Sequence, residues 1–143
     1  MANRLCKILI ADRNRHVREF LRRELGAEGY QVEVARDGGE LLKLMGSDPP
    51  PHLLILDLEL PYLDELEIWT RLQGRQPPLP VVIHTFLPEP PSHLTAPLAA
   101  AFLEKKGDTN ELKAVVAEVL SRYYPNISAG SAGEPEIGRY SKG

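Results

Sequence analysis

Five polar side chains stand just after apolar runs of the sequence. Asp12 and Arg13 follow one such run, and Asp57, Thr85 and Lys105 follow three others. In open α/β sheets, ligands bind beyond the carboxyl ends of the strands, where the winding direction reverses. We therefore expect two carboxylates, a hydroxyl and two cations to converge on one edge of a sheet and to form a ligand site there.

Such an edge requires a parallel sheet, and the apolar runs have the character of its strands. Residues 8–11, 53–56 and 81–83 are continuously apolar, as expected of central strands that are covered on both faces. Residues 31–34 alternate between polar and apolar, and the run at 101–103 is short, so both suit the sheet edges. The sequence thus predicts five strands.

Between these runs, the spacing of apolar residues changes to about 3.6, which is typical of helices that pack on a sheet. Residues 17–25 and 112–123 carry the clearest stripes. Residues 41–45 carry a weaker stripe, which Gly46 and the prolines at 49–51 should end. The alternation of strands and helices predicts a doubly wound α/β fold with right-handed crossovers.

Two acidic pairs predict where helices begin. Asp64 with Glu67, and Asp108 with Glu111, have the spacing of an N-cap carboxylate and an acidic third helical residue, and they mark the third and last helices. The fourth crossover differs, because its prolines predict a shortened or distorted helix. These prolines are Pro88, Pro90, Pro91 and Pro97.

The chain has 143 residues, of which 43% are hydrophobic, and this is enough for one domain with a single core. We expect residues 1–124 to form that domain. Residues 125–143 are rich in Pro, Gly, Ser, Ala and Glu without apolar periodicity, and they predict a flexible C-terminal tail or the stub of a linker.

Composition argues against several classes of partner. A formal net charge of −3 does not indicate a direct contact with nucleic acid or with a membrane. The single cysteine, Cys6, excludes an internal disulfide and fits a reducing compartment. No apolar run has the length of a signal peptide or a membrane span, so we expect a soluble cytoplasmic protein.

The other titratable side chains give no second site. The four histidines share no spacing typical of metal ligands, and no base stands beside a nucleophile as in a hydrolase or transferase, so we expect no enzyme that turns over a substrate. A basic cluster around the first helix predicts a solvated face or, alternatively, a docking surface for a kinase or another acidic partner. Its members are Arg13, Arg15, Arg18, Arg22 and Arg23.

Four segments of the sequence resemble the signature segments of the response-regulator receiver domain of two-component signalling. They are residues 7–12, 54–61, 80–85 and 102–105, and the resemblance extends over residues 5–123. It implies a flavodoxin-like, five-stranded parallel sheet with strand order 2-1-3-4-5. It also implies a histidine kinase or phosphotransfer protein as a partner, a downstream protein or output domain, and a possible homodimer.

The resemblance assigns a role in phosphoryl transfer to four residues. Asp57 is implied to be the nucleophile that becomes an aspartyl phosphate. Lys105 is implied to pair with Asp57 or with the phosphoryl oxygens, and the Thr85 hydroxyl to bond to the phosphoryl group once it arrives. Phe102 stands at the position of the aromatic switch that turns inward as Thr85 moves. Phosphorylation would then bias a two-state surface.

The resemblance also implies a magnesium ion. Its ligands would be Asp12, Asp57 and the backbone carbonyl of Glu59, since magnesium prefers oxygen ligands. Arg13, however, stands where the family has a second acidic residue, and a guanidinium cannot ligate a cation. We expect magnesium affinity to fall. Alternatively, Arg13 and Lys105 neutralise the two aspartates without metal. The Glu59 carboxylate could replace the lost ligand or block the approach to Asp57.

Two further departures from the family surround the same site. Phe86 follows Thr85 where a small residue is usual, and its ring could crowd the entrance. Lys106 follows Lys105 where a cis-proline is usual, and a trans bond is expected here because the cis form costs roughly 2.5–4 kcal/mol outside proline. Two functions remain open: a receiver that accepts phosphate on Asp57, and a pseudo-receiver interaction module that is locked by Arg13.

Overall fold

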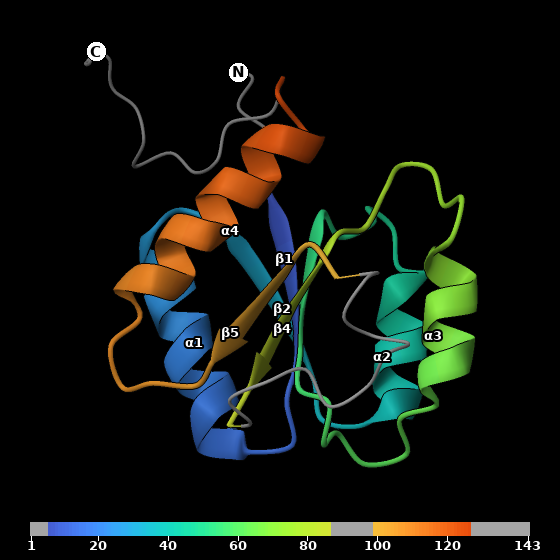
Figure 1. Cartoon of the computed structure of the whole chain (residues 1–143), viewed down its shortest axis with the longest axis horizontal. Helices are drawn as coiled ribbons and strands as arrows, with labels where there is room; N and C mark the ends of the chain where they lie inside the picture. Colours follow the sequence, from blue (N-terminus) through green and yellow to red (C-terminus); the bar gives the residue numbers. More distant parts are fainter. Residues whose placement is uncertain (1–5, 87–98, 127–143) are drawn as a thin grey trace.

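A computed structural model describes residues 6–86 and 99–126 of the chain, and this part forms a five-stranded sheet flanked by helices (Figure 1). All four strand pairings are parallel, and the order across the sheet is β2-β1-β3-β4-β5. The predicted doubly wound, flavodoxin-like sheet with strand order 2-1-3-4-5 is therefore confirmed. The two segments predicted as edge strands lie at the two edges.

The elements alternate along the chain as the apolar spacing predicts. The strands are β1 (Lys7–Ala11), β2 (Gln31–Ala35), β3 (Leu53–Leu56), β4 (Val81–Thr85) and β5 (Ala101–Glu104). The helices are α1 (Arg15–Ala27), α2 (Gly38–Met45), α3 (Glu65–Leu72) and α4 (Asn110–Tyr123).

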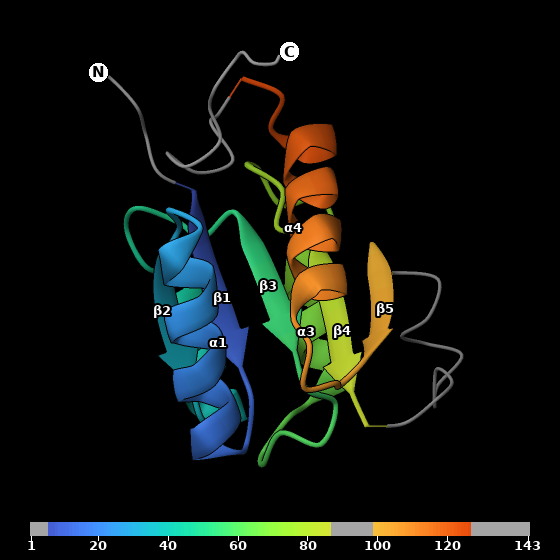
Figure 2. The same ribbon diagram turned by 90° about the vertical axis from the view of Figure 1, so that its left-hand side faces the viewer.

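The central strands are buried on both faces, so their alternate side chains fill two cores. Ile8 and Ile55 belong to the core that α1 and α4 cover. Leu9 and Leu54 belong to the core that α2 and α3 cover. Figure 1 shows these two helix pairs on opposite sides of the sheet, and Figure 2 shows α1 and α4 together in front of it. Both faces must be covered for strands this apolar to be stable in water.

One of the two predicted helix starts is confirmed and the other is displaced. Asp64 caps α3, since its carboxylate accepts a hydrogen bond of 3.1 Å from the backbone N–H of Glu67. The prediction that Asp108 caps the last helix is wrong, because Thr109 is the residue that precedes α4. Asp108 instead accepts a bond of 2.8 Å from the N–H of Asn110, two residues on. A short carboxylate can form such a turn in place of a cap.

A polar contact ties α1 to the start of α4. The Glu24 carboxylate accepts hydrogen bonds from Lys113 Nζ at 2.9 Å and from the buried hydroxyl of Thr109 at 3.1 Å. These two hydrogen bonds lower the pKa of Glu24. The contact anchors the loop that leads from β5 into α4, and Lys105 lies in that loop.

The loop that follows β3 rests directly on the start of α2. The N–H of Gly38 donates to the carbonyl of Pro61 at 2.8 Å. Tyr62 has a positive φ of 58° and is 89% exposed, so the chain turns sharply there without burying its ring. A Cβ at Gly38 would stand 1.9 Å from the Tyr62 carbonyl oxygen. Glycine is required at this contact because any side chain would push away the loop that carries Asp57.

Two predictions fall outside the described residues. The shortened fourth helix was predicted within residues 87–98, and most of the predicted tail lies beyond residue 126. None of the helices in the described ranges combines the length and the apolar character that a membrane span requires.

We expect Gly38→Ala to destabilise the chain by about 1–3 kcal/mol or more, because the added methyl group overlaps backbone atoms that cannot turn away. Gly26→Ala is the control, since a Cβ at this position in α1 meets nothing within 4 Å. Alanine in a helix is favoured over glycine, so the control should gain about 0.5–1 kcal/mol. Denaturant unfolding of both variants measures the difference, and an equal stability of the two would contradict the role of this contact.

Candidate functional site

Lys105 joins the two buried aspartates at the carboxyl end of the sheet. Its Nζ lies 2.8 Å from Asp12 Oδ2 and 3.4 Å from Asp57 Oδ2. The side chains are nearly inaccessible, at 4% for Lys105 and 2% for each aspartate. The residues follow β1, β3 and β5, so the parallel register brings together groups that are far apart in the sequence. Buried charges require such pairing, because an isolated one would be strongly disfavoured.

Backbone N–H groups fix the orientation of the Asp57 carboxylate. Glu59 N donates to Oδ1 at 2.9 Å, and Arg13 N donates to Oδ2 at 3.3 Å. The backbone of Asp57 is itself held in the sheet, since its N–H donates to the Ala11 carbonyl at 2.9 Å. One oxygen of this carboxylate thus faces Arg13 and Lys105, and the other faces the loop after β3.

Asp12 is anchored at both of its oxygens. Oδ2 meets Lys105, and Oδ1 accepts a hydrogen bond of 2.8 Å from the N–H of Asn14. The side chain of Asn14, and not that of Asp12, caps α1. Arg18 donates to the Asp12 carbonyl at 2.8 Å and holds the same turn from the helix.

Arg13 reaches the edge of this cluster and bridges two carboxylates. Its Nη2 lies 2.5 Å from Glu59 Oε1, and its Nε lies 3.9 Å from Asp57 Oδ2. The side chains of Arg13 and Glu59 are 45% and 41% exposed, so the bridge lies on the solvent side of the buried aspartates. Arg13 therefore places a positive charge at the mouth of the site.

The hydroxyl residue and Phe102 of the predicted site lie on β4 and β5, and Phe86 directly follows β4. Thr85 is buried at the end of β4, and its carbonyl accepts a hydrogen bond of 2.6 Å from Lys105 N. Phe86 is 59% exposed, and its ring centre lies 4.9 Å from Lys105 Nζ. The face of an aromatic ring attracts a cation, so the Phe86 ring makes a favourable contact with the Lys105 ammonium group. Phe102 is half-buried against the core under α2 and α3.

Lys106 stays outside the cluster. Its Nζ lies 3.3 Å from Glu111 on α4, and both side chains are exposed. The cis bonds of the described residues precede Pro49 and Pro77, so the bond between Lys105 and Lys106 is trans, as predicted. Lys105 reaches both aspartates with this trans bond.

His84 is a buried titratable group that the sequence did not single out. It lies on β4 and lines a surface hollow of about 400 Å³ together with Phe20, Phe86 and Lys105. Its Nδ1 has no hydrogen-bond partner among the described residues. Burial and the nearby charge of Lys105 lower the pKa of His84 to about 4, against a smaller raising effect of Asp57. Its place inside an apolar run was the signal that could have indicated burial.

The donors at this site do not fit a magnesium ion in the arrangement observed. Each oxygen of Asp12 and Asp57 already faces an N–H group or a cation, and the Glu59 carboxylate is taken by Arg13. Within the described ranges, no three His, Cys, Asp or Glu side chains are grouped to hold a metal. Magnesium requires near-octahedral oxygen ligands, which a neighbouring guanidinium disfavours.

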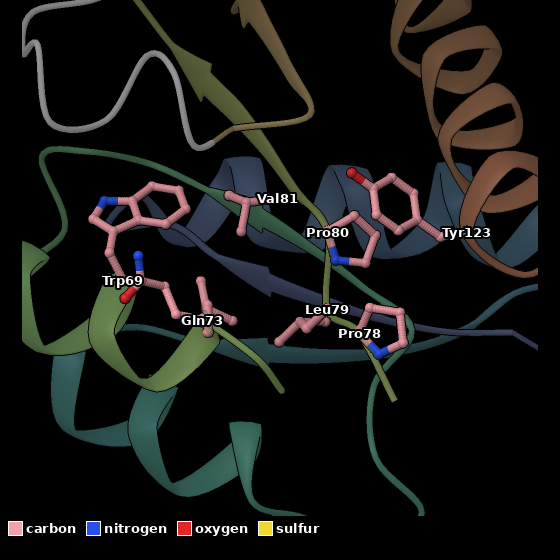
Figure 3. A pocket seen from close by; sticks show the side chains of 8 residues that line it. Trp69, Gln73, Pro78, Leu79, Pro80, Val81 and Tyr123 are labelled. Atoms are coloured by element: carbon pink, nitrogen blue, oxygen red, sulfur yellow. The ribbon is translucent and has the colours of Figure 1, made fainter. Parts of the chain in front are cut away.

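A separate cavity of about 190 Å³ lies beside the start of β4, at the end of that strand remote from Thr85. Figure 3 shows Trp69 and Gln73 on one side of it, and Pro80 and Tyr123 on the other. Its lining includes no charged residue, so it offers packing space and no reactive group. The chemistry of the described residues is concentrated at the Asp57 end of the sheet.

The family of the chain follows from a match to the model of the response regulator receiver domain over residues 8–117. The chain belongs to this family. Response regulator MprA from Mycobacterium tuberculosis is 38% identical over 127 residues, which cover 87% of this chain and 55% of that protein. The receiver chain thus spans about half the length of the curated relatives it matches.

Solved structures agree with this family at the level of the fold. Response regulator protein TrrA from Thermotoga maritima, crystallised with Mg²⁺-BeF, matches with a TM-score of 0.71 and 30% identity, over 80% of this chain and 99% of that one. A structure of the histidine kinase ThkA in complex with TrrA matches with a TM-score of 0.71 and 30% identity, over 82% of this chain and 100% of that one. The present chain is a receiver domain of two-component signalling.

We expect Lys105→Met to destabilise the receiver by about 3 kcal/mol, because it leaves two buried carboxylates without their shared cation. Lys106→Met is the matched control, since it removes the neighbouring lysine from an exposed pair with Glu111. Such pairs contribute less than about 1 kcal/mol. The free energy of unfolding in denaturant measures both, and similar values for the two variants would refute the buried cluster as a stabilising unit.

The stability of the receiver should fall in acid because of His84. Its pKa is about 4 in the folded chain and 6.5 as its ordinary value, so the unfolded chain binds the proton first. The stability that neutral His84 contributes to the folded chain is fully present above pH 6.5, and it is lost as the pH falls toward 4. Between pH 7 and 4.5 the loss should reach about 2–3 kcal/mol. His84→Leu should remove this part of the pH dependence, whereas replacement of the exposed His16 should retain it.

Proposed function

We propose that Asp57 accepts a phosphoryl group from a histidine kinase or from a small phosphodonor. The observation that carries the proposal is the buried carboxylate of Asp57, which backbone N–H groups orient beside Lys105 at 3.4 Å. An oxygen of Asp57 forms a bond to phosphorus while the bond from phosphorus to the donor atom breaks. The donor atom is a histidine nitrogen of the kinase, which retains the electron pair and takes up a proton, or the carboxylate oxygen of a small phosphodonor such as acetyl phosphate, which retains the electron pair and leaves as acetate.

Lys105 and Thr85 have supporting roles in this proposal. The ammonium group of Lys105 neutralises charge on the phosphoryl oxygens, as preorganised cations do in phosphoryl transfer. The Thr85 hydroxyl bonds to the phosphoryl group, and Phe102 at the half-buried edge strand responds to that movement. The two arrangements of these side chains would present different surfaces to a downstream protein or output domain.

The related structures support a kinase as the donor. TrrA shares 30% identity with this chain, and it has been crystallised both with Mg²⁺-BeF and in complex with the histidine kinase ThkA. We infer an equivalent class of partner here. The curated relatives are named response regulators about twice as long as the matched region, and by analogy the receiver would control a second part of a longer protein.

The bridge between Arg13 and Glu59 favours a second candidate function. It lies on the solvent side of Asp57, with Nε of Arg13 at 3.9 Å from the acceptor oxygen. If this bridge persists, the receiver works as a phosphorylation-independent interaction module, a pseudo-receiver. Arg13 and Lys105 would then hold the site in one state.

Intact mass after incubation with acetyl phosphate and magnesium tests the two functions. We expect wild type to gain one phosphoryl group and Asp57→Asn to gain none, because the amide is no nucleophile. Asp64→Asn is the matched control, since this aspartate caps α3 outside the cluster. No gain in wild type, together with a gain in Arg13→Asp, would instead identify the pseudo-receiver.

A further inference from the structure

We propose that the guanidinium of Arg13, held by Glu59, takes the place of a divalent cation, so that a phosphoryl group is bound at Asp57 without magnesium. This inference rests on the proposed phosphorylation of Asp57 and names the group that would stabilise it. The oxygen atoms of the site do not fit magnesium as arranged, and Arg13 lies beside them with its guanidinium between Asp57 and Glu59.

Arg13 and Lys105 approach the same oxygen of Asp57 from different elements. Lys105 Nζ lies 3.4 Å from Oδ2, Arg13 Nε lies 3.9 Å from it, and the Arg13 N–H donates to it at 3.3 Å. A phosphoryl group on that oxygen would lie beside two cations, Arg13 from the β1–α1 loop and Lys105 from the loop after β5. Fixed charges of this kind stabilise developing negative charge because no solvent has to reorient.

The charge of the cluster supports this reading. Three carboxylates, on Asp12, Asp57 and Glu59, meet two cations, on Arg13 and Lys105, so one negative charge remains. With an acidic residue at position 13, three negative charges would remain, and a divalent ion would be needed to offset them. Arg13 supplies part of this positive charge permanently, since its guanidinium does not lose its proton in proteins.

The guanidinium also has the right geometry for the task. It is planar, carries five N–H donors and recognises phosphate through two parallel hydrogen bonds. Its Nη2 contacts Glu59 at 2.5 Å, and its Nε lies 3.9 Å from Asp57 Oδ2. Glu59 is therefore a positioning residue: it holds Arg13, and the pairing keeps its own carboxylate from repelling the phosphoryl group.

Binding of beryllium fluoride, a mimic of the phosphoryl group, tests the inference on the full chain by ¹⁹F NMR in buffers with and without magnesium. We expect wild type to bind it in both buffers with affinities that differ less than about tenfold. Arg13→Asp should bind at least about tenfold more weakly than wild type without magnesium, because one charge-assisted contact is lost. Magnesium should restore its binding.

Two further variants complete the test, of which Arg15→Asp is the control. Arg15→Asp makes the same charge change at an exposed residue in the first turn of α1, and it should retain metal-free binding. Glu59→Gln should weaken metal-free binding by removing the residue that holds Arg13. Circular dichroism of each variant shows whether the fold is intact.

The outcomes separate this inference from the proposed function. Binding by wild type only with magnesium would overturn the role of Arg13 and leave phosphorylation of Asp57 standing. A failure of folded wild type and folded Arg13→Asp to bind in either buffer would overturn the phosphoryl site itself. Binding by Arg13→Asp alone would overturn the inference in favour of the locked pseudo-receiver.

Discussion

The pairing of one buried lysine with two buried aspartates is the constraint on which the site depends. Lys105, Asp12 and Asp57 are all nearly inaccessible, and their opposite charges offset the cost of burying one another. Their meeting requires three strands of one parallel sheet to end at the same level. The ion pairs of the site therefore depend on the topology of the sheet. The sheet in turn depends on the two helix layers, which cover its two faces.

Two loops set the electrostatics around the triad of Lys105, Asp12 and Asp57. The β1–α1 loop brings Arg13 to the Asp57 carboxylate, and the loop after β3 brings Glu59 to Arg13. The second loop rests on Gly38, so the packing of α2 indirectly sets the position of the Glu59 carboxylate. A receiver fold can therefore keep its buried triad and change the electrostatics of its mouth through exposed residues alone.

Much of the fold was predictable because apolar spacing directly reflects burial. Continuous apolar runs identified the central strands, and strand ends identified Asp12, Asp57 and Lys105 as neighbours. Helix boundaries were less predictable, since the actual start of α4 after Thr109 depends on local backbone turns. The bridge from Arg13 to Glu59 joins two loops, and its length follows from their backbone paths, which no periodicity encodes.

Trp69 lies beside the start of β4, whereas the charged cluster lies at the carboxyl end of the sheet. It is the single tryptophan of the chain, it is buried on α3, and its Nε1 has no hydrogen-bond partner within the described part. It borders the cavity beside the start of β4 (Figure 3), and the lining of this cavity includes no residue of the charged cluster. The fluorescence of Trp69 is therefore an optical probe of the packing between α3 and the start of β4.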